Sequence, residues 1–316
     1  MSKKIKYFLV VLFTFTSIVT ACNKLTESDS ITVQKKSVNF IVIGDWGRNG
    51  DYLQRETAVQ LNKSVRETKA SFVVSTGDNF YENGIASIDD PQWWFSFEDV
   101  YRGANLYINW YAVLGNHDYH GSAKAQIDYS KKSRRWRMPN YYYSFERKIP
   151  SSSEKILFVF LDTNQFEKNY YQNEEKYPEL IKQDSKEQLK WIDSVFAASN
   201  AAWKIVIGHH HVYTGGSRKD QVSETGLILE PILKKYGVNA YFCGHEHDLQ
   251  YLKPKGNTHF IISGAGSELR PTSYLPITKF AKSENGFVAA SITQKELLIE
   301  FINYKGELIY KKLISK

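Results

Sequence analysis

The feature of this sequence that most constrains its fold is a series of short, continuous apolar runs that end in a glycine. Such runs are typical of strands buried on both faces of a sheet, as in parallel α/β structures. After five of these glycines the chain places an aspartate, an asparagine or a histidine. Because α/β folds bind their ligands at the carboxyl edge of the sheet, we expect these side chains to converge there. The five segments are Gly44-Asp45-Trp46-Gly47, Gly77-Asp78-Asn79-Phe80-Tyr81, Gly115-Asn116-His117-Asp118, Gly208-His209-His210-His211 and Gly244-His245-Glu246-His247.

The rest of the chain alternates strand-like and helix-like stretches, which predicts βαβ units and an α/β fold. One helix is expected around residues 58–65, a second begins at a capping box of Ser185 and Gln188, and a third ends at Gly237. No helix separates the last strands, so part of the sheet is expected to be antiparallel. The predicted strands are Val38–Ile43, Ser71–Ser75, Asn109–Leu114, Ile156–Leu161, Trp203–Ile207, Val238–Phe242, His259–Ser263, Phe287–Ile292 and Leu297–Ile302.

The N-terminus predicts an exported protein. Residues 1–21 have three lysines, an apolar run and then small residues, which is typical of a signal peptide. The segment Val19-Thr20-Ala21-Cys22 resembles a bacterial lipobox, so we expect cleavage before Cys22 and lipidation of that cysteine; ordinary secretion after cleavage at Ala21 is the alternative. Residues 22–37 are then a flexible tether, and residues 38–316 form a single domain.

The charge balance argues against a dedicated nucleic-acid binder. The chain has 41 Lys and Arg against 34 Asp and Glu, a net charge of +7, and three of these charges belong to the signal segment. A nucleic-acid-binding domain needs a concentrated basic footprint. We interpret the densest basic stretch as a solvated loop, with steering of anionic substrates as the second interpretation. It comprises Lys131, Lys132, Arg134, Arg135 and Arg137.

The two cysteines predict no structural disulfide. If Cys22 carries lipid, Cys243 is left as a free thiol without a partner in the chain. A cysteine count this low also excludes a small scaffold held together by disulfides.

Each of the five polar segments has an ordinary explanation by itself. Aspartate and glycine are common in turns, and adjacent histidines are more often solvated than metal-bound. Together, however, they supply carboxylate, amide, phenol and imidazole donors that suit iron, zinc or manganese. One bridging carboxylate would make the set sufficient for two ions. Two ions ~3.5–4 Å apart hold both the attacking and the leaving oxygen of a displacement at phosphorus.

In this order the five segments resemble the signature blocks of metallophosphoesterases of the purple acid phosphatase family. Tyr81, three residues after Asp78, distinguishes purple acid phosphatases from the wider superfamily. The chain length and further blocks are similar to the small, tartrate-resistant branch, and the resemblance runs from about Phe40 to Leu313. It implies a four-layer α/β/β/α sandwich, with two packed mixed β-sheets flanked by helices. The further blocks are Tyr129-Ser130-Lys131, Arg135-Trp136, Gln188-Leu189-Lys190-Trp191 and Gly264-Ala265-Gly266.

The resemblance also implies a binuclear centre of Fe(III) and a divalent iron, zinc or manganese ion. The ferric ligands would be Asp45, Asp78, Tyr81 and His247. The divalent ligands would be Asp78, Asn116, His209 and His245, with Asp78 bridging. Tyr81 as a phenolate favours Fe(III) and gives the family its colour; an aromatic residue that only packs near the site is the alternative.

By the same resemblance, His117 contacts the substrate phosphate and is the general acid for the leaving alkoxide, a role that suits a group titrating near neutrality. The family has a second histidine after the Gly-His block, where this chain has Arg218. His211 or Arg218 replaces it, or His117 acts alone. The ordinary interpretation of His210 and His211 is a solvated loop.

The resulting hypothesis is a purple acid phosphatase that hydrolyses small phosphate monoesters by direct attack of a metal-bound hydroxide. One alternative is a manganese or zinc metallophosphoesterase acting on diesters or pyrophosphates, and another is a non-catalytic phosphate-binding surface lipoprotein. We expect a monomer that binds no nucleic acid and is attached by its lipid to the bacterial cell envelope, in the periplasm or at the surface, or is otherwise secreted. The aperiodic stretch Asn164–Asp184 predicts a mobile lid.

Overall fold

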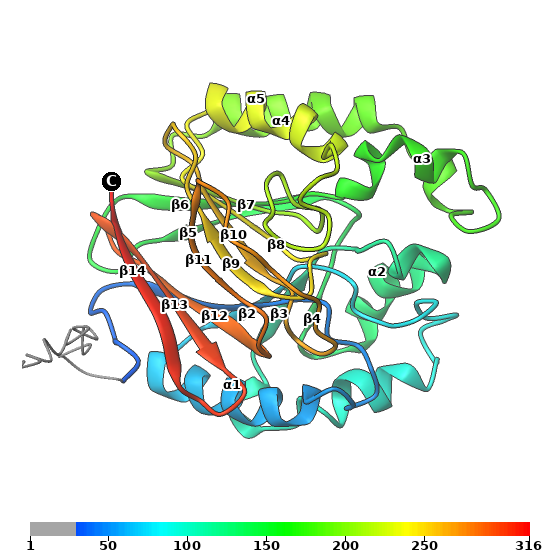
Figure 1. Ribbon diagram of the computed structural model, residues 1–316, viewed down its shortest axis with the longest axis horizontal. Coiled ribbons are helices and arrows are strands. Elements are labelled where there is room, and N and C mark those ends of the chain that lie inside the picture. The colour runs from blue at the N-terminus through cyan, green and yellow to red at the C-terminus, as the bar shows by residue number, and fades with distance from the viewer. Residues whose placement is uncertain (1–29) are drawn as a thin grey trace, which may run out of the picture.

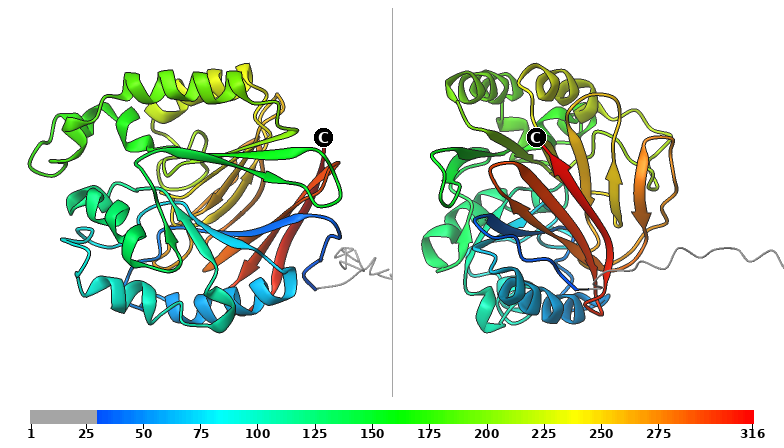
Figure 2. Two further views of the ribbon diagram at one scale, coloured as in Figure 1. Left: turned by 180° about the vertical axis from the view of Figure 1, so that it is seen from behind. Right: turned by 90° about the vertical axis from the view of Figure 1, so that its left-hand side faces the viewer.

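The computed structural model describes residues 30–316 (Figure 1), so the predicted signal peptide and Cys22 lie outside the described residues. Two seven-stranded mixed sheets stack face to face, and helices cover their outer faces. Figure 2 shows the same layers from behind and from the side. The predicted four-layer α/β/β/α arrangement is therefore confirmed. Within residues 30–316, every helix is too short or too polar to cross a membrane.

The first sheet has the strand order β14-β13-β12-β1-β2-β3-β4. Strands β1 to β4 run parallel, whereas β12 to β14 pair antiparallel and attach to β1 through partners such as Val42 and Val288. The antiparallel part predicted for the C-terminal strands is thus confirmed. The strands are β1 (Val38–Ile43), β2 (Phe72–Ser75), β3 (Asn109–Ala112), β4 (Trp136–Arg137), β12 (Gly286–Ile292), β13 (Glu296–Asn303) and β14 (Leu308–Ser315).

The second sheet has the strand order β11-β9-β10-β8-β7-β6-β5. Its central strands β6, β7, β8 and β10 run parallel, and antiparallel strands close both edges. The edge strands were missed in the sequence because their faces are more polar. The strands are β5 (Tyr143–Lys148), β6 (Lys155–Phe160), β7 (Trp203–Ile207), β8 (Ala240–Cys243), β9 (Leu249–Leu252), β10 (His259–Ser263) and β11 (Thr278–Lys282).

The main core lies between the two sheets. Phe40 of β1 and Phe72 of β2 stack with ring centroids 5.3 Å apart, and Phe158 of β6 meets both rings edge-on at 5.3 and 5.4 Å. Phe242 of β8 contacts Phe40 from the second sheet at 6.0 Å. This dry aromatic contact fixes one sheet against the other and hence the loops that leave both sheets at their carboxyl ends.

Helix α1 packs on β1 and β12 of the first sheet, and α4 and α5 cover the second sheet, where Ile192 and Leu229 belong to the same buried cluster as Val206. The helices are α1 (Gln54–Thr68), α2 (Ala123–Lys132), α3 (Lys168–Tyr171), α4 (Ser185–Ala198) and α5 (Glu224–Lys235), a short π-helix η1 (Trp93–Glu98), and the 3₁₀ turns η2 (Ala104–Leu106), η3 (Asp118–His120), η4 (Thr163–Phe166) and η5 (Leu180–Lys182).

The capping box predicted for α4 is wrong. Asp184 is the N-cap, and its carboxylate accepts a hydrogen bond from the backbone N–H of Lys186. The side chain of Gln188 instead points inward and makes two hydrogen bonds to the backbone of Asp162, at 2.9 and 3.0 Å. The buried N–H and C=O groups of Asp162 need an acceptor and a donor, and the side-chain amide of Gln188 supplies both. The Gln188 side chain therefore binds more strongly there than at the N-terminus of its own helix. After α5, Gly237 has φ 60°, as a glycine that ends a helix requires.

The predicted solvated loop at Arg135 is also wrong. This side chain is only 2% exposed. It forms an ion pair with Glu98 at 2.8 Å, donates to the backbone oxygens of Phe97 and Tyr101, and covers the Phe97 ring at 4.2 Å. Arg135 therefore joins β4 to the aromatic segment around η1. Lys131 and Lys132, in contrast, are exposed as predicted.

The stretch predicted as a lid contains η4, α3 and η5 and packs against neighbouring elements. The Tyr170 ring of α3 stacks on the Tyr177 ring at 4.4 Å, and the Tyr170 hydroxyl lies 3.0 Å from Nε2 of His210. Glu167 accepts hydrogen bonds from the backbone and hydroxyl of Thr225 at the start of α5. The mobility of this stretch stays a prediction.

The described part of the predicted tether contacts the first sheet. The backbone N–H of Thr32 donates to the Glu300 carboxylate on β13 at 2.9 Å, and Lys311 on β14 donates to the Thr32 hydroxyl at 2.6 Å. Residues from about 30 onward therefore lie along this sheet.

Candidate metal centre

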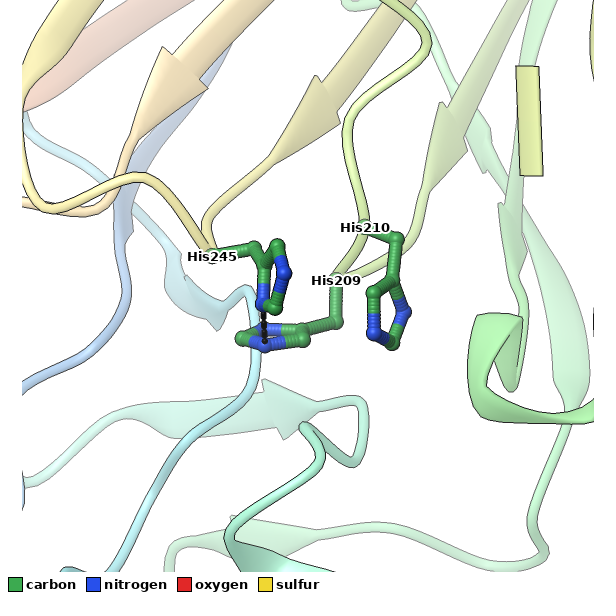
Figure 3. Close-up of side chains that lie close together, drawn as sticks. All are labelled: His209, His210 and His245. Atoms are coloured by element: carbon green, nitrogen blue, oxygen red, sulfur yellow. Dashed lines mark hydrogen bonds between the residues drawn. The ribbon is translucent and has the colours of Figure 1, made fainter. Parts of the chain in front are cut away.

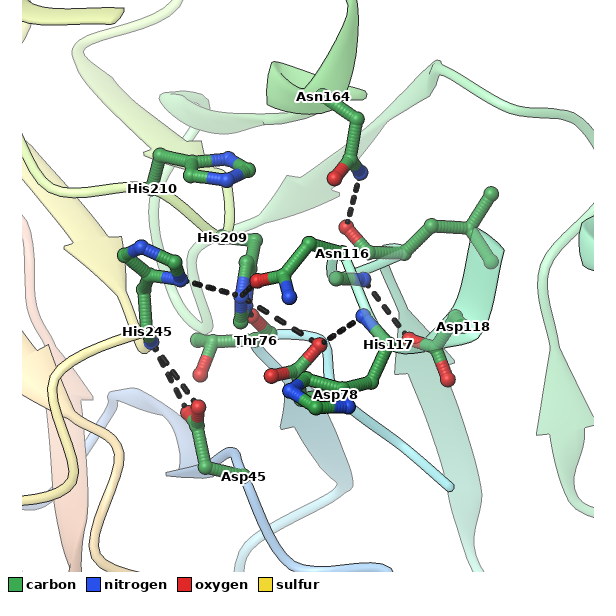
Figure 4. A network of polar contacts seen from close by, with 12 residues as sticks. Asp45, Thr76, Asp78, Asn116, His117, Asp118, Asn164, His209, His210 and His245 are labelled. Atoms are coloured by element: carbon green, nitrogen blue, oxygen red, sulfur yellow. Dashed lines mark hydrogen bonds and ion pairs between the residues drawn. The ribbon is translucent and has the colours of Figure 1, made fainter. Parts of the chain in front are cut away.

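The five polar segments meet at one place, between the carboxyl ends of two different sheets. Three of them follow β1, β2 and β3, and two follow β7 and β8. Figure 4 shows Asp45, Asp78 and Asn116 from the first group together with His209 and His245 from the second. The expectation of a single sheet edge is corrected here: each sheet supplies about half of the donors, and the aromatic core between the sheets aligns the halves.

One cluster of donor atoms surrounds the Tyr81 hydroxyl. It lies 2.9 Å from Asp78 Oδ2, 3.2 Å from Asp45 Oδ1 and 3.1 Å from His247 Nε2. His247 Nε2 is in turn 3.5 Å from Asp45 Oδ1. All four side chains are buried. They are the four residues predicted to hold the ferric ion.

A second cluster surrounds Nε2 of His209. This atom lies 3.1 Å from His245 Nδ1, 3.3 Å from Asn116 Oδ1 and 3.5 Å from Asp78 Oδ1. Figure 3 shows the close approach of the His209 and His245 rings. Asp78 therefore turns one oxygen to each cluster, as a bridging carboxylate would.

The spacing within both clusters fits metal coordination. Ligand atoms bound about 2.0–2.2 Å from an ion stand about 2.9–3.5 Å from one another around it. The distances above, from 2.9 to 3.5 Å, fall in this range. The imidazole nitrogens, carboxylates, amide oxygen and phenol are donors that transition metals accept. The residues present thus fit two ions.

Electrostatics also favour cations at this place. Burial and the nearby carboxylate of Asp78 raise the pKa of Asp45, and burial together with both carboxylates raises the pKa of Tyr81. Burial lowers the pKa of His245 and lowers that of His247 to about 3, so both imidazoles are neutral, as ligands must be. Crowded buried acids beside neutral histidines need positive charge from elsewhere, and bound metal ions supply it.

Backbone contacts orient the donors. Nδ1 of His209 donates to the backbone oxygen of Thr76 at 2.9 Å, which leaves Nε2 free to bind an ion. The Asp45 carboxylate accepts from the backbone N–H of His245 at 3.1 Å, and Asp78 Oδ1 accepts from that of His117 at 2.9 Å. Such outer contacts fix the direction in which a ligand presents its free atom.

Two glycines are required because another loop's carboxylate occupies the space of their missing side chain. A Cβ on Gly115 would lie 2.1 Å from Asp78 Oδ1, and one on Gly244 would lie 2.1 Å from Asp45 Oδ2. These glycines therefore make room for donors that come from other strands.

His117 lies beside the first cluster with its side chain 20% exposed. Its Nδ1 is 2.6 Å from the backbone oxygen of Glu82. Since a carbonyl oxygen only accepts, Nδ1 carries the hydrogen and Nε2 remains for another partner. The His117 ring lies 4.6 Å from the Tyr81 ring, so the predicted general acid is next to the donors.

His210 and His211 are buried, at 3% and 6% exposure, so the solvated-loop interpretation is wrong. His210 lies close enough to His209 and His245 to join an ion site (Figure 3). Its nitrogens, however, contact the Thr163 hydroxyl at 2.8 Å and the Tyr170 hydroxyl at 3.0 Å. Because both nitrogens already have partners, His210 ties the α3 stretch to the site instead of binding metal.

Arg218, which we expect to stand where the family has its second histidine, is anchored next to the second cluster. Its Nη1 lies 3.2 Å from the backbone oxygen of His245 and 3.4 Å from Glu246 Oε1. Glu246 is fully buried and also accepts from the backbone N–H groups of Ser217 and Arg218. The prediction that His211 or Arg218 takes the role of this histidine, or that His117 acts alone, stays a prediction.

The sequence interpretation missed two buried acids that support the ligands. Asp118 accepts from the backbone N–H groups of Asn79 at 3.0 Å and of Gly115 at 2.8 Å, and so ties together the loops after β2 and β3. Glu246 supports the Arg218 loop in the same way. The sequence could have indicated both acids, because they lie inside the Gly-Asn-His-Asp and Gly-His-Glu-His segments, next to proposed ligands.

Comparison with known proteins agrees with this geometry. The Calcineurin-like phosphoesterase family profile matches residues 38–249. Purple acid phosphatase 17 of Arabidopsis thaliana is 36% identical, with the match covering 98% of this chain and 93% of that protein. Tartrate-resistant acid phosphatase type 5 of Homo sapiens is 32% identical, covering 89% of this chain and 91% of that protein.

Two solved structures share the fold. A purple acid phosphatase from yellow lupin seeds superposes with a TM-score of 0.68 at 17% identity, over 89% of this chain and 54% of that one. A Plasmodium protein described as the anchor in the inner membrane complex superposes with a TM-score of 0.77 at 24% identity, over 88% of this chain and 89% of that one. The chain belongs to the calcineurin-like phosphoesterases and, within them, to the purple acid phosphatase family.

Proposed function

We propose that this protein is a metal-dependent acid phosphatase that hydrolyses small phosphate monoesters. The observation that carries the proposal is the pair of donor clusters sharing Asp78, with Tyr81 in one of them. We assign Fe(III) to Asp45, Asp78, Tyr81 and His247, because a phenolate favours that ion. A divalent iron, zinc or manganese ion is assigned to Asp78, Asn116, His209 and His245. When bound, two such ions activate water and neutralise the phosphate in a displacement at phosphorus.

His117 is the proposed general acid. Its Nδ1–H is held by the Glu82 carbonyl, so a proton on Nε2 is the one available for the leaving alkoxide. Protonation of an alkoxide in the transition state contributes about 10²–10⁴-fold to rate. His117→Ala should therefore lose activity in that range on alkyl phosphates, and lose much less on esters with a good leaving group. Equal losses on both would remove His117 from this role.

One preparation of the full-length protein tests the assignment. We expect two metal ions per chain, one of them iron, a visible absorption band, and hydrolysis of monoesters that is strongest in acid. Tyr81→Phe should abolish the band, and Asp78→Ala should lower the content of both metals. In a single turnover with chiral phosphate, direct attack inverts the configuration at phosphorus, and retention would contradict it.

The same measurements distinguish the alternatives. A colourless, iron-free and active protein that prefers diesters or pyrophosphates would indicate a manganese or zinc phosphoesterase. An inert protein that nevertheless holds two metals would indicate a non-catalytic phosphate-binding lipoprotein.

We further propose that the mature chain is a monomer attached to a bacterial envelope membrane through lipid on Cys22. The basic start, the short apolar run and the lipobox-like segment before Cys22 support the lipid attachment. A single lipidated terminus needs no membrane-spanning helix. Cys22→Ser should move the protein from the membrane fraction to the soluble fraction, whereas continued membrane retention would contradict the proposal.

A further inference from the structure

A polar cavity lies at the end of the second sheet that is away from the metal donors. It has a volume of about 370 Å³ and is lined, where β7, β8 and β10 begin, by Trp203, Asn239 and His259. The first sheet contributes Ile314 of β14, and Lys316 follows that strand. Because β7, β8 and β10 run parallel, the loops with the proposed metal ligands leave β7 and β8 at their opposite ends. The cavity is therefore distinct from the metal centre.

Trp203 brings an unpaired hydrogen-bond donor to this cavity. The side chain is fully buried, and its Nε1–H has no acceptor among residues 30–316. An indole N–H can only donate, so its partner must be an atom that accepts. Nearly all buried polar groups of folded proteins have such a partner. The unpaired donor therefore indicates that a molecule with acceptor atoms binds in the cavity.

Three lysines lie in or beside the cavity, with one counter-ion between them. Lys253 lines it and donates to two backbone oxygens of the turn before β10. Lys312 lies two residues before Ile314 in β14 and hence on the same face of that strand. Lys316 forms an ion pair with Glu154 at 3.5 Å. Within residues 30–316, no carboxylate oxygen lies within 4.0 Å of the ammonium groups of Lys253 and Lys312.

The surroundings of His259 show that these charges act on the cavity. Burial, followed by the nearby Lys253 and Lys312, lowers the pKa of His259 to about 4. Its Nδ1 is 2.8 Å from the Tyr251 hydroxyl, so Nε2 is the ring nitrogen left for a further partner. The described residues that line the cavity include no aspartate and no glutamate. Uncompensated positive charge and an unpaired donor in one place fit an anion.

We propose that this cavity binds a small oxyanion, held by the indole N–H of Trp203 and by the charges of Lys253 and Lys312. Such an anion has a negative charge and several acceptor oxygens, so it supplies what the unpaired donor and the two lysines lack. Its binding groups come from both sheets, so the anion joins the beginning of the second sheet to β14 of the first. Inorganic phosphate and dicarboxylates share this chemistry. The inference is independent of the metals and of the proposed phosphatase function.

The indole ¹H–¹⁵N signal of Trp203 in the metal-loaded protein reports binding directly, and Trp203→Phe identifies this signal. Inorganic phosphate and malonate are titrated at constant ionic strength, with chloride as the control. We expect at least one of the two oxyanions to shift the signal in a saturable manner, and chloride to shift it much less. The oxyanion that binds more tightly identifies the class of ligand. A signal that responds to neither oxyanion means that water alone satisfies Trp203, which overturns the inference.

Variants locate the binding, because phosphate also binds at the metals according to the proposed function. Lys253→Gln and Lys312→Gln should each weaken the binding detected at Trp203 at least tenfold, whereas Lys312→Arg keeps the charge and should retain it. Lys186→Gln is the matched control, since Lys186 is exposed and has no carboxylate partner within residues 30–316. Lys312 is also exposed, so its replacement decides the question even if Lys253→Gln does not fold. Equal affinities in the wild type and Lys312→Gln would place the anion elsewhere and refute the site.

Discussion

The guanidinium carbon of Arg48 lies 4.0 Å from the centroid of the Tyr81 ring, on the face of the phenol that belongs to the first donor cluster. Arg48 is held there by ion pairs with Glu82 and Glu268, and its side chain is only 10% exposed. A cation over an aromatic face stabilises the electrons of that ring. Arg48 therefore affects the electron energies of Tyr81, the residue that the resemblance to purple acid phosphatases makes responsible for the colour.

Replacing Arg48 by glutamine should move the visible band of the iron-loaded protein to longer wavelength. Without the positive charge the phenolate electrons are less tightly held, so their transfer to Fe(III) needs less energy. The freed carboxylates of Glu82 and Glu268 act in the same direction. The readout is the absorption maximum at unchanged iron content, with Arg102→Gln as control. An unmoved band would show that Arg48 has only a structural role.

Replacing Arg135 should destabilise the fold although this arginine stands in a strongly basic stretch. Arg135→Met leaves Glu98 and several buried carbonyl oxygens without their donor, which costs about 3 kcal/mol or more. The neighbouring exposed Arg134 offers a matched control, and Arg134→Met should change stability by less than about 0.5 kcal/mol. Urea unfolding of the three metal-loaded proteins measures both values. Equal midpoints for the two variants would contradict the buried role.

His259 should make the protein less stable in acid. Burial, with Lys253 and Lys312 nearby, lowers its pKa to about 4, whereas an unfolded chain has a histidine pKa of about 6.5. Between these values the unfolded state binds more protons, so stability falls as the pH drops from about 6.5 to 4.

The partial exposure of His259 limits this effect to about 1–2 kcal/mol. His259→Gln should reduce the loss of unfolding free energy between pH 7 and pH 4.5 relative to wild type. Because His259 begins β10, at the end of the strand away from the metal donors, metal binding cancels in the comparison. The same pH dependence in variant and wild type would assign the acid sensitivity to other groups.

Tyr170→Phe should loosen the α3 stretch. The change removes the hydroxyl contact with His210 and keeps the stack on Tyr177. A lost hydrogen bond of about 1 kcal/mol corresponds to an about fivefold larger population of the locally open state, and hence to about fivefold faster hydrogen exchange. Hydrogen exchange of residues 167–183 is the measurement, with Tyr107→Phe as control because Tyr107 is 63% exposed. Unchanged protection would mean that other contacts hold this stretch.

The strands and donor types of this protein could be predicted from local sequence. Runs such as Val38–Ile43 and Trp203–Ile207 are strands with the predicted bounds, because a mostly apolar stretch that ends at a glycine has the side chains that a buried strand needs. The polar residue after each glycine likewise identifies a candidate donor. The edge strand β5 escaped prediction because pairing with β6, not its own pattern, makes it a strand.

Roles that depend on partners far away in the chain were misjudged. Gln188 has the spacing of a capping residue, yet it binds the backbone of Asp162. Arg135 looks solvated within a basic stretch, and His210 looks solvated within a histidine run, yet both are buried with polar partners from other elements. In each case the side chain forms its hydrogen bonds with buried polar groups of other elements instead of with water.

The sequence by itself determined which residues can donate to metals, since donor chemistry and strand endings are local properties. Only the tertiary structure decided that the donors come from two sheets and that Asp78 faces both clusters. Asp45 and His245 are 200 residues apart and touch because the aromatic core aligns their sheets. The order of the strands within each sheet brings Arg48 over Tyr81 and Arg218 beside Arg270. No local pattern encodes such contacts, because the packing of strands from different parts of the chain determines them.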